Sequence, residues 1–248
     1  MSNLLLLAGA GFLAGAMNAA AGGGSFVSFP AMIFAGVPPV YANASSTVAL
    51  FPGAVTSGWA YRNLLGGIGA VTLPALLIVS VIGGLLGAVL LLATPQNAFN
   101  ALVPWLLLLA TVAFAFGRQA GAALRRMVHI GRVTTLAAQF LLAIYGGYFG
   151  GAVGIMMMAV WSLLSSSDLR QMNPTKTVLV GAMNGMAVLY FIAAGAVVWP
   201  QTLAMLFAAA LGGYAGARVA MRLDQRWLRA GVIAISSVIT ASFFWRGV

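Results

Sequence analysis

The sequence has little of what a water-soluble protein needs on its surface. Only 6% of its 248 residues are charged, 62% are hydrophobic, and the mean hydropathy is +1.03. A soluble globular chain carries about 25% charged residues, so this composition excludes an ordinary soluble domain. Apolar runs of about 20 residues, the length that crosses a bilayer as a helix, follow one another along nearly the whole chain. We therefore predict an all-α, polytopic helical membrane protein in which residues 1–248 form a single transmembrane domain.

Several kinds of chemistry are excluded by the residues that the chain lacks. It has no cysteine, which removes disulfides, thiolate catalysis and cysteine metal sites. Its single histidine, His129, cannot form a histidine metal cluster. The two acidic residues, Asp168 and Asp224, fall in junctions between apolar runs, so no predicted span contains a carboxylate for a cation or a proton. We expect no metal site, and an intramembrane enzyme would be left with Ser/Lys chemistry alone.

The charge that remains is strongly one-sided, with a net value of +10. The basic residues stand in short clusters between apolar runs, which is typical of topology signals rather than of a nucleic-acid site. One cluster, Arg218, Arg222, Arg226 and Arg229, has helical spacing and is expected to contact lipid headgroups. The first apolar stretch lacks the basic region that precedes a signal peptide's apolar core, so we expect it to be retained as a helix. The predicted partners are therefore membrane lipid and no nucleic acid.

Internal similarity divides the chain into two copies of one unit. Two pairs of segments carry the match, at separations of 130 and 129 residues: YANASSTVAL (41–50) with QMNPTKTVLV (171–180), and GGLLGA (83–88) with GGYAGA (212–217). We predict one repeat over about 4–117 and a second over about 133–246. Transporters built from repeats place their site between the copies.

Each copy contains five apolar segments, the second of which is too short to cross a bilayer alone. The segments are about 4–21, 25–37, 42–61, 68–92 and 98–117, then 133–152, 154–167, 172–194, 200–218 and 227–245. The short segments are candidate broken helices, so the protein has about 8–10 membrane segments. If they cross with their glycine-rich neighbours, each copy crosses five times and the second copy is inverted. Every basic residue except Arg246 is then cytoplasmic, as the positive-inside rule requires, and both termini are outside.

The stretch GAMNAAAGGGSFVSFP, residues 15–30, is the first candidate for a substrate site. Three consecutive glycines inside a helix cost about 1 kcal/mol each relative to alanine, which predicts that the backbone leaves the helix there. Ser25 could then cap the next short helix, whose free N–H groups and dipole suit an anion. The candidate ligands are Asn18, Gly22, Gly23, Gly24 and Ser25. The alternative is that the glycines only allow close helix packing.

A polar stripe in each copy is the second candidate. On a helix, residues at these spacings share one face, and a polar face avoids lipid. The stripe of the second copy consists of Asn173, Lys176, Thr177 and Asn184, and that of the first copy of Asn43, Ser46, Thr47 and Ser57. Serine and threonine commonly bond to their own helix, and a lysine near a helix end can extend its ammonium to the interface, so structural roles stay open.

These motifs together resemble a known family. Residues 15–65, DLRQMNPTKTVLVGAMNGMAVLYF (168–191), GAVVWP (195–200) and LGGYAGARVA (211–220) are similar to the sulfite exporter TauE/SafE family, also called the toluene-sulfonate uptake permease family. The resemblance covers nearly the whole chain. One departure is that the second copy reads GGAVGIMMMAV (150–160), without the triple glycine that many members carry in both copies.

The resemblance implies a multi-pass carrier in the cell membrane for a small anion such as sulfite, an organosulfonate or a related carboxylate, without an organic cofactor. By position, the family's motifs fall on Gly22 to Gly24, Asn43, Ser45, Ser46, Asn173 and Lys176. We expect a secondary transporter that exports its substrate. An anion channel, an uptake permease coupled to H⁺ or Na⁺, and a homo-oligomer stay open.

Overall fold

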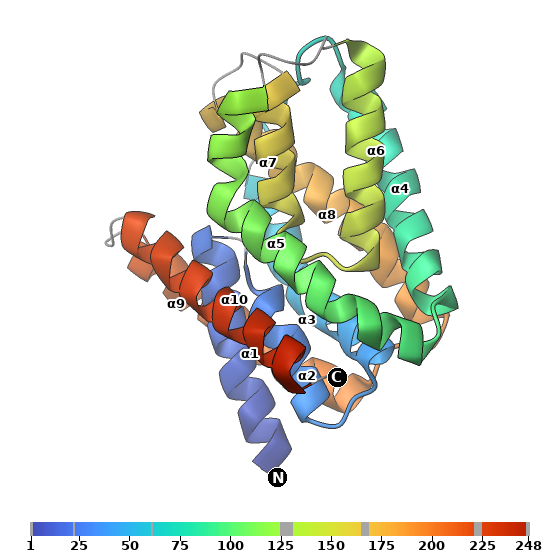
Figure 1. The fold of residues 1–248 in the computed structure, drawn as a ribbon, viewed down its shortest axis with the longest axis vertical. Helices are drawn as coiled ribbons and strands as arrows, with labels where there is room; N and C mark the ends of the chain where they lie inside the picture. The colour runs from blue at the N-terminus through green and yellow to red at the C-terminus, as the bar shows by residue number, and fades with distance from the viewer. Residues whose placement is uncertain are drawn as a thin grey trace.

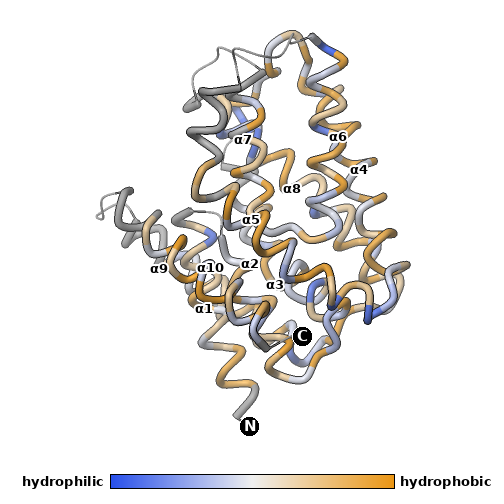
Figure 2. Tube along the Cα trace, in the orientation of Figure 1, coloured by the Kyte–Doolittle hydropathy of each residue, from blue (hydrophilic) through white to orange (hydrophobic). Residues whose placement is uncertain are grey.

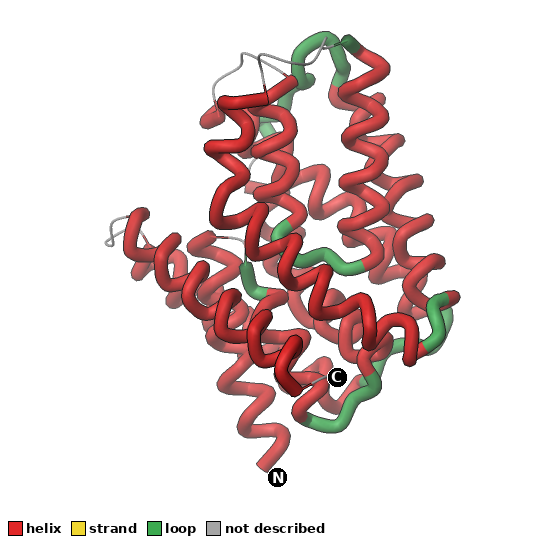
Figure 3. Tube along the Cα trace, in the orientation of Figure 1, coloured by secondary structure: helices red, strands yellow, loops and turns green. Residues whose placement is uncertain are grey.

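The computed structural model describes residues 2–21, 23–60, 62–124, 131–164, 169–220 and 225–246. Within these residues the chain forms ten helices and no strand (Figures 1 and 3). They are α1 (Ser2–Ala21), α2 (Ser25–Phe34), α3 (Pro39–Ala60), α4 (Leu73–Ala93), α5 (Gln96–Leu124), α6 (Arg132–Tyr148), α7 (Val153–Leu164), α8 (Leu169–Ala193), α9 (Trp199–Ala220) and α10 (Gln225–Arg246). The predicted all-α class is confirmed, and each predicted apolar segment corresponds to one helix.

The two short helices are as short as the sequence indicates. α2 has 10 residues and α7 has 12, or about 15 and 18 Å, too little to cross a hydrocarbon core of about 30 Å. α2 ends three residues before its predicted end because Gly36 adopts a left-handed conformation with φ +86°. α4 starts at Leu73 rather than at residue 68, because residues 68–71 close a tight turn in which Ile68 and Val71 exchange backbone hydrogen bonds.

The exterior of the helical body is apolar, as a membrane requires. In the described part of the chain, three helical stretches are long and apolar enough to cross a bilayer: Leu73–Ala93, Gln96–Ala113 and Met172–Ala193. Shorter apolar helical stretches include Leu4–Ala19 and Ala230–Trp245. Figure 2 shows apolar residues along the lengths of α4, α5 and α6. Together with the family assignment below, this identifies a multi-pass membrane protein.

Helices α1 and α9 pack with their backbones in close approach. A Cβ atom added at Gly15 would overlap the carbonyl oxygen of Ala209 and lie 2.7 Å from its carbonyl carbon. One added at Gly212 would overlap the carbonyl oxygen of Phe12 and lie 2.7 Å from its Cα. Glycine is therefore required at both positions, as in other membrane helix pairs that meet through small residues.

Helices α4 and α6 form a second pair of the same kind. A Cβ atom at Gly87 would overlap the carbonyl oxygen of Ile144, and one at Gly147 would overlap that of Gly84. Each pair combines one helix from each predicted copy: the first helix of copy one with the fourth of copy two, and the reverse. Such an exchange is what two copies related by a two-fold axis would produce, and it favours the predicted repeat.

The ends of the chain also agree with the predicted topology. In Figure 1, α1 begins and α10 ends toward the lower end of the molecule, whereas the loop of residues 62–72 and the start of α6 lie at the upper end. The positive-inside argument makes the upper end cytoplasmic.

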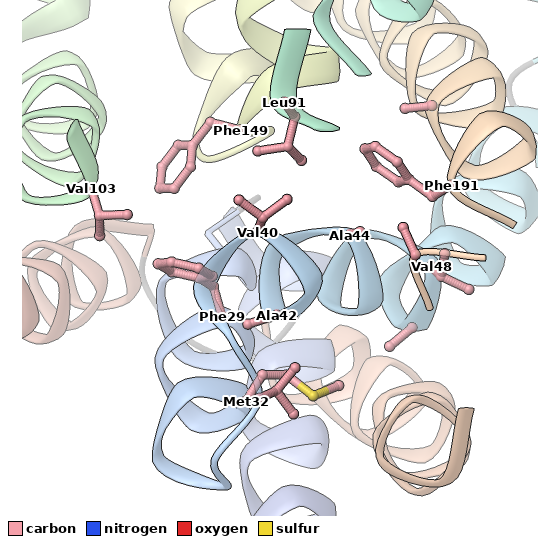
Figure 4. Packing of buried hydrophobic residues seen from close by; sticks show 14 of the residues in the cluster. Phe29, Met32, Val40, Ala42, Ala44, Val48, Leu91, Val103, Phe149 and Phe191 are labelled. Carbon is pink, nitrogen blue, oxygen red and sulfur yellow. The ribbon is translucent and has the colours of Figure 1, made fainter. Parts of the chain in front are cut away.

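The centre of the molecule is organised around the first half of α3. Figure 4 shows Val40, Ala44 and Val48 of α3 with Leu91, Phe149 and Phe191 on one side of the helix. Phe29 of α2 contacts the rings of Phe99, Phe149 and Phe243, with centroids 5.7 to 6.3 Å apart. Because this part of α3 is enclosed on several sides, its polar residues are buried and must find partners inside the protein.

Candidate functional site

The first break separates α1 from α2, but it is not an unwound loop over its whole length. Gly24 has helical angles (φ −58°, ψ −33°), precedes α2 and provides no side-chain cap. The N–H groups of residues 26–28 bond to the carbonyls of Gly23 and Gly24 at 3.1 to 3.2 Å. The prediction that Ser25 caps α2 and leaves these N–H groups free is therefore wrong, because helical glycine carbonyls already satisfy them. Gly22 lies outside the described residues.

Close packing explains at least one of these glycines. A Cβ atom at Gly24 would lie 2.5 Å from the carbonyl oxygen of Ala14 and 3.0 Å from the Cβ of Asn18, both on α1. One at Gly23 would lie 3.0 Å from Val232. The break thus allows α2 to fold tightly back onto α1, and it brings the half-buried Asn18 beside Gly24.

The polar residues of α3 connect this helix to both breaks. The Oγ of Ser46 lies 2.6 Å from the Oγ of Ser28 on α2, and both side chains are buried. The Nδ2 of Asn43 donates to the carbonyl of Tyr148, the last residue of α6, at 2.9 Å. The hydroxyl of Thr47 donates to the carbonyl of Asn43 in its own helix, as is common for threonine. The side chain of Ser57 lies outside the described part of the structure.

The second break, between α6 and α7, does leave the helical path. Gly150 and Ala152 have positive φ angles of 76° and 55°. The hydroxyl of Tyr145 donates to the carbonyl of Gly151 at 3.0 Å and holds the loop against α6. The backbone is therefore more irregular in the copy that lacks three consecutive glycines, and an alanine occupies one left-handed position. A non-glycine residue in that conformation is uncommon outside functional sites and turns.

Lys176 lies against the helix that follows this second break. Its Nζ donates to the Oδ1 of Asn173 at 2.7 Å, and a Cβ atom at Gly154 in α7 would lie 3.4 Å from its Cδ. The side chain is half-buried and belongs to the membrane-spanning stretch of α8. Asp168 and Asp224 lie outside the described residues, and within them the ammonium has a neutral amide as its partner.

The remaining members of the α8 stripe differ in their bonding. The hydroxyl of Thr177 donates to the carbonyl of Asn173 at 2.9 Å, in its own helix. Asn184 follows Lys176 by eight residues, or about 12 Å along a helix. Its side-chain oxygen is buried and has no hydrogen-bond partner in the described structure, which is unusual for a buried amide.

The structure therefore places two polar positions that correspond by sequence against the two short helices. Ser46 and Lys176, 130 residues apart, lie against α2 and α7 respectively. In the first copy two hydroxyls meet directly, whereas in the second copy an ammonium and an amide lie beside the break. Only the second position offers a charge to an anion.

Sequence reasoning missed several polar contacts near these positions. Ser28 stands three residues after Ser25 in the same short helix, but nothing in the sequence pairs it with Ser46. Thr175 is fully buried and bonds to Gly66, a residue 109 positions away. Its 130-residue separation from Ser45 was a signal that could have singled it out.

Comparison with known proteins identifies the family. The family model described as sulfite exporter TauE/SafE matches residues 7–243. The chain is 29% identical to a Sinorhizobium protein named probable membrane transporter protein ORF9, over 92% of this chain and 87% of that protein. It is 24% identical to a probable membrane transporter protein of Haemophilus influenzae (98% and 94%) and 25% identical to YfcA of Escherichia coli (94% and 86%), also named a probable membrane transporter. The chain thus belongs to the sulfite exporter TauE/SafE family and is a multi-pass transporter of the cell membrane.

Proposed function

We propose that this transporter binds a small oxyanion at Lys176 and moves it across the membrane as a secondary carrier. The observation that carries the proposal is the half-buried ammonium of Lys176 within a membrane-spanning stretch, with the neutral amide of Asn173 as its described partner. A cation at membrane depth is costly unless an opposite charge accompanies it. A substrate anion would supply that charge.

The neighbouring residues suit an oxyanion such as sulfite, an organosulfonate or a carboxylate. Asn173 lies at the ammonium, and Thr177 and Asn184 continue the same face of α8 toward the middle of the helix. The first copy would contribute from the other side through its α3 stripe and first break. Those residues are Asn43, Ser46 and Thr47 on α3, and Asn18, Gly22, Gly23, Gly24 and Ser25 at the break. The bond from Asn43 to the end of α6 brings α3 to the second break, where Lys176 lies.

The proposed direction is export, driven by the membrane potential. With the cytoplasm negative, moving one negative charge outward gains about 2.3 kcal/mol per 100 mV, roughly a fifty-fold gradient. The two acidic residues of the chain lie in predicted junctions rather than in spans, so no carboxylate is available there to couple H⁺ or Na⁺. In proteoliposomes, anion efflux should follow an imposed potassium-diffusion potential. Flux that ignores the potential and follows a pH or sodium gradient would replace uniport with a coupled carrier, and flux too fast for a carrier cycle would indicate a channel.

The binding site is tested by removing the charge of Lys176. We expect Lys176→Gln to weaken binding of sulfite or a small sulfonate by about 10-fold to 150-fold, since a hydrogen bond to a charged group contributes about 1.5 to 3 kcal/mol. Arg132→Gln, at an exposed position at the start of α6, is the control and should bind normally. Calorimetry on the purified, folded variants would measure both. Equal affinities for the two variants would show that Lys176 only extends its charge to the interface.

A second variant separates charge from structure. Asn173→Asp would place a carboxylate at the position that now lies 2.7 Å from the ammonium. We expect it to form an internal ion pair and to exclude the anion while the protein stays folded. Unchanged anion affinity would contradict a site at Lys176.

A further inference from the structure

Two loops fold back into the protein at opposite ends. The loop between α3 and α4, residues 62–72, lies at the upper end in Figure 1, and the loop between α8 and α9, residues 194–198, lies in the lower part. Each inserts apolar side chains into the interior. Ile68 and Val71 of the first loop are 2% exposed, and Ala196 and Val197 of the second are also buried.

Each loop is packed among residues of the other predicted copy. Ile68 and Val71 belong to a buried cluster that includes Trp161 of α7 and Met172 of α8. Ala196 and Val197 belong to the main cluster, which includes residues of α2 and α3 such as Val48. Both loops therefore close the boundary between the copies, one at each end.

One hydroxyl from the opposite copy holds each loop. The Oγ1 of Thr175 accepts the N–H of Gly66 at 3.1 Å and donates to the carbonyl of the same residue at 2.9 Å. The Oγ of Ser45 accepts the N–H of Val198 at 3.0 Å. Thr175 and Ser45 are both 0% exposed, and they are 130 residues apart, the separation that relates the two polar stripes.

These bonds differ in kind from the contacts that hold the helix pairs together. The pairs α1–α9 and α4–α6 meet backbone against backbone and cannot separate without losing many packed atoms. A hydroxyl-to-peptide bond contributes only about 0.5 to 1.5 kcal/mol net, because water replaces it once the loop moves out. The loops are therefore the parts of the boundary between copies that can open at the lowest cost.

We propose that the two loops are the gates of the carrier, with Thr175 latching the gate at residues 62–72 and Ser45 latching the gate at residues 194–198. In a carrier made of two related copies, the central site opens to one side at a time. The two latches release in alternation, and both are closed in this structure. Ser45 thus controls access and does not bind substrate. The inference rests on the alternating access that is part of the proposed function.

The test uses the absence of cysteine. Single reporters, Val71→Cys in one gate and Val197→Cys in the other, are introduced and the purified protein in detergent is alkylated with a soluble maleimide, without substrate. Adding Thr175→Val should raise the alkylation rate of the Val71→Cys reporter about tenfold, as the loss of two hydrogen bonds implies, and should leave the other reporter unchanged or slower. Adding Ser45→Ala should raise the rate only at Val197→Cys, by about fivefold.

Matched controls lack a contact between copies. The buried hydroxyls of Thr135 and Ser236 donate to carbonyls close by in their own sequence, Gly131 and Ile233. Thr135→Val and Ser236→Ala should change neither reporter. If a latch variant accelerates both reporters equally, or neither, the gates are refuted. Normal anion binding by Lys176→Gln together with end-specific labelling would refute the proposed site but not the gates.

A covalent lock gives a second reading that does not depend on a destabilising variant. The position of Gly66 has room for a side chain, since a Cβ there meets nothing within 4 Å. A Gly66→Cys, Thr175→Cys pair, once oxidised, should stop anion flux in proteoliposomes, and a reductant should restore it. Transport that continues with the disulfide formed would overturn the gate at residues 62–72.

Discussion

The close approach of α1 to α9 predicts a large effect for the smallest change at Gly15. A methyl group there would overlap the carbonyl oxygen of Ala209 and lie 2.8 Å from its Cα, so the obstacle is backbone rather than a flexible side chain. Gly9, on the same helix, is exposed, and a Cβ at that position meets nothing within 4 Å. The two alanine substitutions therefore differ only in what the new methyl group meets.

The expected size follows from the distances. Carbon atoms pack favourably at about 3.5 to 4.0 Å, so the helices must separate by roughly 1 Å to admit the methyl group. A gap of 0.5 to 1 Å loses a quarter to a half of each affected dispersion contact, and overpacking of this kind costs about 1 to 3 kcal/mol. Alanine gains about 1 kcal/mol over glycine in a helix, which partly offsets the loss at Gly15 and acts alone at Gly9. We expect the variants to differ in stability by about 2 to 3 kcal/mol.

Unfolding in mixed detergent micelles, followed by tryptophan fluorescence or circular dichroism, would measure this difference. Gly15→Ala should unfold at a lower denaturant fraction than the unmodified protein, and Gly9→Ala at the same or a higher fraction. Equal stability of the two variants would show that α1 and α9 do not meet through Gly15.

Two further predictions concern a buried network and the orientation in the membrane. Gln139 donates to Ser80 at 2.8 Å and accepts from the indole of Trp161 at 3.2 Å, all three fully buried, so Gln139→Leu should cost about 2 to 3 kcal/mol in the same unfolding assay; no change would mean that water or other groups replace the network. In intact cells a membrane-impermeant maleimide should label Asn97→Cys, at the start of α5, and not Asn63→Cys, in the loop after α3. The reverse pattern would invert the topology.

The sequence by itself determined the class of the protein and the positions of its helices. The length of an apolar run and the thickness of a bilayer decide whether a segment spans, and Gly and Pro mark where helices end, so both are local properties. The short segments at 25–37 and 154–167 accordingly appeared as α2 and α7. Lys176 and Asn173 could also be paired in advance, because residues three apart are neighbours on a helix. The family followed from motifs that are contiguous in the chain.

Only the tertiary structure decided which partners the buried polar groups have. Ser46 meets Ser28, Asn43 meets the carbonyl of Tyr148, and Ser45 meets the N–H of Val198, across separations of 18, 105 and 153 residues. Two of these partners are backbone groups, which every residue offers, so the sequence carries no signal for them. The state of the breaks was likewise a matter of packing: Gly24 stays helical because α1 lies against it, whereas Ala152 takes a left-handed conformation in a loop held by Tyr145. Local propensity ranks glycine above alanine for leaving a helix, but contacts between distant segments outweigh a difference of about 1 kcal/mol.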